Sequence, residues 1–145
     1  MRSELPPIAK AAARIRATIE ESVNRFARVH RYSVGADLRD RARVVVRCSL
    51  TAWRDRQRQL FRARELSQAI DDLKTDLMLA QDVSAFRSGN EFEDRARMVR
   101  DLGRQCGGWL KELEKKGQNV AVNPPRQRAH ALSGRSASVA AGANT

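Results

Sequence analysis

Residues 66–80 read LSQAIDDLKTDLMLA, and their apolar side chains recur at alternating steps of four and three residues. The stripe consists of Leu66, Ile70, Leu73, Leu77 and Ala80. This spacing places about one apolar side chain per turn on a single face of an α-helix, as at the a and d positions of packed helices. We therefore predict a helix here that buries one face against other helices.

Three further segments have the same helical spacing. Pro6 and Pro7 open the first, as expected for residues favoured in a first turn. No Gly or Pro ends the second, but Arg56 would fall on its apolar face, so we place its end near Asp55–Gln59. The predicted helices cover residues 7–29, 36–57, 62–86 and 91–116. Four amphipathic helices with short connections predict an all-α fold, an antiparallel up-down-up-down four-helix bundle over residues 5–117.

The composition changes after Gly117. Residues 118–145 contain Pro124 and Pro125, followed by a stretch rich in Ser, Ala and Gly, with three arginines and no acidic residue. Such a segment buries too little apolar surface to offset the entropy of ordering. We therefore predict a disordered basic tail.

The charge is large and unevenly distributed. The 145 residues carry a net charge of +11, and 23 of the 28 cations are arginines. Residues 1–64 contain 16 cations and 6 anions, whereas residues 65–101 contain 5 cations and 9 anions. Arginine grips phosphate or carboxylate in two places, so the balance predicts an acidic partner, either a polyanion or an acidic protein. The acidic segment of a second copy is another candidate partner, through head-to-tail assembly.

The arginines of the second helix are grouped. Five of them fall within about a 100° arc opposite the apolar stripe, provided that the helix reaches residue 58. A second basic arc lies on the first helix, and the turn that follows it adds an imidazole and a cation. The predicted phosphate contacts are therefore Arg14, Arg25, Arg28, His30, Arg31, Arg39, Arg43, Arg47, Arg54 and Arg58.

Sequence patterns of catalysis are missing. The chain has no Walker loop, GxGxxG, CxxC or HExxH. Cys48 and Cys106 lie on apolar helix faces and are predicted to be core thiols. No apolar run approaches the ~18 residues of a spanning helix, and no apolar region follows the charged N-terminus. We expect a cytoplasmic protein that is not an enzyme, does not bind membranes, and needs no metal or cofactor.

Two features are unusual for a simple bundle. Gly107 and Gly108 precede Trp109 inside the fourth helix, where they indicate either close approach of a helix or subunit, or a local kink. Tyr32 lies in the turn after the first helix, where it would either stack on a base or pack on the core. We group these four residues as candidate oligomer and packing contacts.

The run FARVHRYSVGADLR at residues 26–39, the four-helix layout and GGWL at residues 107–110 resemble the Avd family, the accessory variability determinants of diversity-generating retroelements. The resemblance covers roughly residues 5–117. It implies a basic four-helix bundle that assembles as a barrel-like homopentamer. It also implies binding to a reverse transcriptase and to its template RNA or cDNA, in support of mutagenic retrohoming without catalysis.

A sister family with the same bundle is encoded by 23S rRNA intervening sequences. Its members typically have Phe-Pro-Lys before a Tyr-Gly-Leu turn and Asn-Ile-Ala-Glu-Gly at the end of the second helix. Here the corresponding positions read RVH at residues 28–30 and LTAWR at residues 50–54, which favours the Avd family. The alternative is a structural, oligomeric interaction protein of this second type, which docks on an acidic protein or on rRNA.

Overall fold

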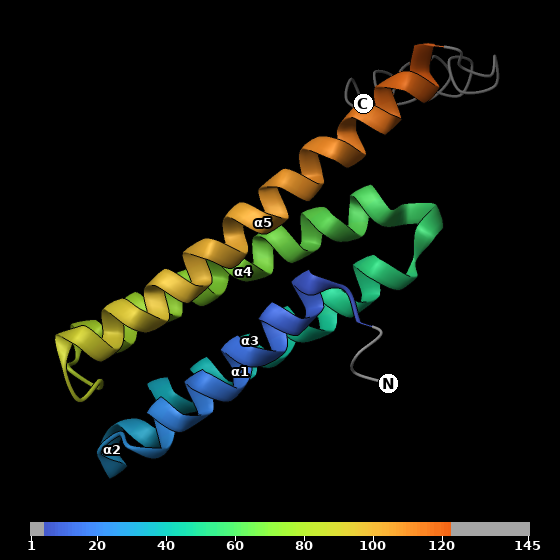
Figure 1. Cartoon of the computed structure of the whole chain (residues 1–145). Helices are drawn as coiled ribbons and strands as arrows, with labels where there is room; N and C mark the ends of the chain where they lie inside the picture. Colours follow the sequence, from blue (N-terminus) through green and yellow to red (C-terminus); the bar gives the residue numbers. More distant parts are fainter. Residues whose placement is uncertain (1–4, 123–145) are drawn as a thin grey trace, which may run out of the picture. The chain divides into compact units, whose positions relative to one another are not determined.

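The computed structural model of the protein describes residues 5–122 and, among these, the side chains of residues 5–117. All regular elements in this range are helical, which confirms the predicted all-helical fold (Figure 1). The elements are α1 (Pro7–Asn24), α2 (Arg28–Arg31), α3 (Val34–Arg54), the 3₁₀ helix η2 (Arg56–Arg58), α4 (Gln59–Asp82) and α5 (Gly89–Val122).

The chain divides into two compact units, residues 1–111 and residues 112–145. The first unit contains α1 to α4 and most of α5. Of the second, only the last part of α5 is described. This helix continues past the predicted boundary at Gly117, because a single glycine weakens a helix by only about 1 kcal/mol and no proline follows until Pro124. The rest of the predicted tail lies outside the described residues.

The first predicted helix, over residues 7–29, is divided in two. Pro7 occupies the first turn of α1 as expected, but the helix ends at Asn24. Ala27 then adopts an extended backbone before the four-residue α2. Phe26, 2% exposed, enters the core in this interruption and packs edge-on against Phe86, with ring centroids 5.1 Å apart. Burial of this ring accounts for the turn.

The second predicted helix, over residues 36–57, is shifted and shorter, because α3 begins at Val34 and the chain turns at Asp55. Asp55 then caps η2 by accepting a hydrogen bond from the backbone N–H of Arg58 at 3.2 Å. The amide of Gln59 donates to the carbonyls of Ala52 and Trp53 at 3.1 and 3.3 Å. These side chains satisfy backbone groups that the helix end leaves free, so the break needs neither Gly nor Pro.

The third and fourth helices also differ in their bounds from the predicted ranges 62–86 and 91–116. The helix α4 covers residues 59–82, and Ser84 follows with a positive φ of 58°. Phe86 is buried beyond the helix end, against Phe26 and Phe92. The side chain of Ser88 accepts a hydrogen bond from the backbone N–H of Glu91 at 3.1 Å, and α5 therefore begins at Gly89.

The core lies along the predicted stripe of α4, whose five residues are each at most 1% exposed. The helix α3 packs against both α1 and α4. The helix α5 meets α4 where the Cys106 thiol lies 3.7 Å from the carbonyl oxygen of Ala63. It meets α1 where Arg95 donates to the hydroxyl of Ser22 at 2.8 Å. Each long helix therefore has two neighbours, as in a helical bundle.

We expect Leu73→Ala to lower the free energy of unfolding by about 2–5 kcal/mol, because it leaves a cavity at a fully buried position. Urea unfolding followed by circular dichroism at one protein concentration measures this loss. Thr75→Ala is the control on the same helix, since Thr75 is exposed and its loss should cost under about 0.5 kcal/mol. Equal losses would contradict this description of the core.

Candidate nucleic-acid interface

The arginines of α3 project in three directions. At about 100° per residue, Arg39 lies on the side of α1 and Arg41 on the side of α4, whereas Arg43, Arg47 and Arg54 lie together on the outer side. We call these last three residues the outer row. Packing of α3 between α1 and α4 decides this division, which the single arc predicted from the sequence did not contain.

The two lateral arginines have partners within the chain. Arg39 donates to Glu20 and to Asn24 of α1, each at 2.8 Å. Arg41 pairs with Asp76 and Asp72 of α4 at 3.1 and 3.8 Å. Arg39, a predicted phosphate contact, therefore joins two helices instead. The acidic α4 also neutralises an arginine of its own chain.

The condition under which the arc would include Arg58 is not met, because α3 ends at Arg54. Arg58 lies in η2 and pairs with Asp55 at 3.3 Å. Arg62 binds the same carboxylate at 3.1 Å, and its hydrogen bond is the main cause that lowers the pKa of Asp55. Arg58 is therefore part of a corner between α3 and α4, not of the outer row.

The outer row is the most accessible cationic group on α3. All three side chains are exposed. Arg43 pairs with Asp40 at 3.3 Å, with both side chains more than half exposed, and such surface pairs are worth only about 0–1 kcal/mol. Within the described residues, Arg47 and Arg54 have no hydrogen-bond or ion-pair partner. The row can therefore accept phosphate oxygens at little cost.

The basic residues predicted on and after the first helix fall into two groups, those that are exposed and those that have a partner within the chain. Arg14 and Arg28 are exposed and, among the described residues, have no partner. Arg25 pairs with Glu91 of α5. Arg31 is half-buried in α2 and donates to the carbonyl of Phe26 at 3.3 Å. The structure thus keeps only part of the predicted arc accessible.

Glu91 collects three donors between α1 and α5. It accepts a hydrogen bond from the hydroxyl of Ser22 at 2.8 Å, and ion pairs from Arg25 and Arg95. Burial raises the pKa of Glu91, but the hydrogen bonds of Ser22 and Arg25 and the two positive charges outweigh burial and hold it below the usual value. This carboxylate is therefore ionised and structural at neutral pH.

The turn around α2 exposes apolar surface. Tyr32 is 69% exposed, so of its two predicted roles the structure leaves it outside the core, and Val29 is 74% exposed. His30 is half-buried. Gly35 is needed here, because a Cβ would lie 2.8 Å from the side chain of Val23. The glycine lets the start of α3 approach α1 closely.

The predicted close approach at Gly107 and Gly108 does not occur within the described chain. A Cβ at either glycine would meet no atom within 4 Å, and α5 continues through both. On α5, the described glycine with close neighbours is Gly103, since a Cβ there would lie 3.1 Å from the Nζ of Lys74. Trp109 is half-buried and packs against the core.

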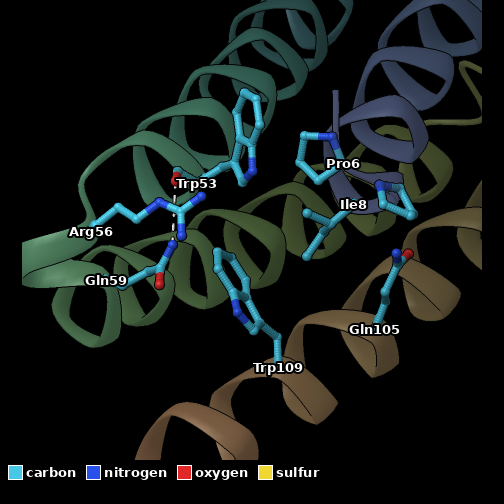
Figure 2. Close-up of a pocket in the computed structure, with 8 residues that line it drawn as sticks. Pro6, Ile8, Trp53, Arg56, Gln59, Gln105 and Trp109 are labelled. Carbon is cyan, nitrogen blue, oxygen red and sulfur yellow. Dashed lines mark hydrogen bonds between the residues drawn. The ribbon is translucent and has the colours of Figure 1, made fainter. Parts of the chain in front are cut away.

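Trp109 also lines a pocket of about 340 Å³ that sequence reasoning missed. Trp53 and Arg56, from the end of α3 and the start of η2, face it across this space (Figure 2). The other lining residues are Pro6, Pro7, Ile8, Gln59 and Gln105. The available signal was Arg56 at the end of an apolar face, close to one of the two tryptophans in the chain.

The thiols are poor nucleophiles. Burial raises the pKa of Cys106 to about 11, with a further contribution from the charge of Asp71. Burial, followed by the charge of Glu65, also raises the pKa of Cys48. No group of metal-ligating side chains is found among the described residues. Over the same part of the chain, no helix is long and apolar enough to cross a bilayer.

Searches against models of known protein families, curated proteins and solved structures found no match to this chain.

We expect Glu91→Gln to lower the free energy of unfolding at pH 7 by about 1–3 kcal/mol, because a neutral amide leaves the two arginines without their anion. Because the pKa of Glu91 is lowered in the folded protein, its carboxylate stabilises the fold at pH values above its ordinary pKa of 4.5. This stabilisation is lost as the pH falls through the lowered pKa. The difference between wild type and variant should therefore shrink in acid. Urea midpoints from pH 7 down to pH 2 measure it, with the exposed Glu93→Gln as control. A pH-independent difference would contradict this role.

Proposed function

We propose that this chain is a non-catalytic accessory protein of the Avd type, which serves a diversity-generating retroelement in the cytoplasm. It binds the element's reverse transcriptase and its template RNA or cDNA, and it supports mutagenic retrohoming. The observation that carries the proposal is the outer row of α3, with two exposed arginines that have no partner in the described chain. Arginine forks suit the phosphate backbone, which dominates affinity for nucleic acids.

In this proposal the phosphates contact the outer row first. Arg14 and Arg28 join it as further exposed cations, whereas Arg25 and Arg39 join helices through their ion pairs and Arg58 is paired locally with Asp55. Contacts of this kind are largely independent of sequence and sensitive to salt. They would let an accessory protein hold different templates while the reverse transcriptase performs the chemistry.

The proposed assembly is a homopentamer of antiparallel up-down-up-down bundles, as the resemblance implies. Exposed apolar side chains support an interface with another protein chain, because removing apolar surface from water lowers the free energy. Four of them lie on or directly after α4, and three of these are close to its end, namely Met78, Leu79 and Val83, which are 60, 51 and 47% exposed. Gly107 and Gly108, open on their outer side, offer space for a neighbouring subunit beside Trp109.

A second candidate is the structural interaction protein of the 23S rRNA intervening-sequence type. The same exposed apolar side chains favour it, since they fit a protein partner as well as a second copy. The numerous ion pairs within the chain also leave fewer cations for a polyanion than the net charge indicates. The two candidates differ in whether the outer row binds nucleic acid.

The triple variant Arg43→Glu, Arg47→Glu and Arg54→Glu should weaken binding to single-stranded RNA, because three phosphate contacts are lost. The dependence of log Kd on log salt concentration should become shallower by about 2. Fluorescence anisotropy at several salt concentrations measures both changes. The matched control replaces three exposed arginines of α5, Arg97, Arg100 and Arg104, by Glu. If both triple variants lose the same affinity, net charge and not the outer row is responsible.

Native mass spectrometry should give a mass of five times the 16.3 kDa chain. Met78→Glu combined with Leu79→Glu should shift the mass toward smaller species, since charges at an interface oppose association. The exposed Lys111→Glu, made in the same way, should not. A monomer at all concentrations would contradict the assembly, and a pentamer that binds no RNA and no reverse transcriptase would favour the second candidate.

A further inference from the structure

The pocket near the end of α3 contains both tryptophans of the chain. From it we infer a stacking site, in which one unstacked base of a single-stranded polynucleotide lies against Trp53 and Trp109. Figure 2 shows the two indoles, Arg56 and the residues that open α1 arranged around a common space. The inference deepens the proposed function and rests on it, because it assigns the bases of the bound strand a place separate from the phosphates.

The lining has the chemistry of a site for a flat, polar ring. Indole faces stack on any base, and a guanidinium adds stacking and hydrogen bonding at the ring edge. The amide nitrogen of Gln59 is held by the carbonyls of Ala52 and Trp53, which leaves its oxygen as an acceptor. Gln105 is exposed and offers both a donor and an acceptor. The volume of about 340 Å³ lies within the usual range for small-ligand pockets.

A strand has a path beyond this pocket. Gln105 also lines a smaller groove of about 150 Å³ between α1 and α5, which contains Arg14 and Asp101. Asp101 is paired with Arg104 at 2.9 Å. Arg14 in the groove and Arg56 in the pocket are exposed and, within the described chain, have no partner. Each of the two spaces therefore contributes one arginine that can contact a phosphate of the bound strand.

A polynucleotide fits this site better than an apolar side chain of a second copy. An apolar occupant would remove Arg56 from water without supplying an acceptor, and burial of an unpaired charge is costly. A nucleotide supplies a phosphate oxygen to the guanidinium while its base covers the indoles. We therefore assign the pocket to nucleic acid, and self-association through it becomes an outcome of the test.

Intrinsic tryptophan fluorescence reports on this pocket alone, because the chain has no other tryptophan. Titration of the full-length protein with single-stranded oligoadenylate should quench the emission, since a stacked base quenches indole. An abasic deoxyribose–phosphate strand of the same length should bind through the arginines without this quenching. Trp53→Ala and Trp109→Ala should each raise the Kd for oligoadenylate roughly fivefold or more, and the exposed Phe61→Ala should not.

The exposed Arg56→Gln and Gln105→Ala keep the test independent of folding, and both should weaken oligoadenylate binding while thermal melting stays unchanged. Equal quenching by the abasic strand, or binding of both strands without quenching, would overturn the stacking site and leave the proposed function standing. Failure of both strands to bind would overturn both. Emission that changes with protein concentration and not with oligoadenylate would assign the pocket to self-association instead.

Discussion

Burial of the apolar face of α4 is the constraint on which the other helices depend. Its stripe lies in one core with the apolar faces of α1, α3 and α5. Once these faces turn inward, the helical period decides which residue of each helix points to a neighbour and which to solvent. On α3 this leaves the outer row exposed and turns Arg39 and Arg41 toward α1 and α4. The packing that stabilises the fold therefore also determines which cations can bind.

Carboxylates pair with some of the arginines of the chain and leave others exposed. Carboxylates of α1, α4 and α5 pair with Arg39, Arg41 and Arg25, respectively, so these guanidinium groups join helices. Asp55 does the same for Arg58 and Arg62 at the corner between α3 and α4. Among the described residues, the ion-pair partner of the outer row is Asp40, at a surface position where pairing is weak. A net charge of +11 thus becomes a local basic surface.

The same corner connects the fold to the proposed stacking site. Because α3 ends at Arg54, Trp53 and Arg56 fall at a helix end, where side chains have fewer neighbours than in the middle of a bundle. Trp109 reaches this place from α5 and Pro6 from the start of α1 (Figure 2). An exposed row of arginines and the proposed base pocket on neighbouring parts of α3 would together suit a flexible single strand, since backbone charge gives affinity and stacking tolerates any base.

The sequence by itself determined the helical class, the four amphipathic segments and the inward face of α4, because these follow from local spacing and from apolar burial. It also indicated a basic surface on α3. The end of the second helix near Asp55 also followed from the sequence. Only the tertiary structure decided that Phe26 interrupts the first helix and that carboxylates of other helices hold Arg25 and Arg39. It alone brought Trp53 and Trp109 together. The physical reason is that helix periodicity is a property of neighbours along the chain, whereas ion pairs and pockets depend on which helices pack side by side.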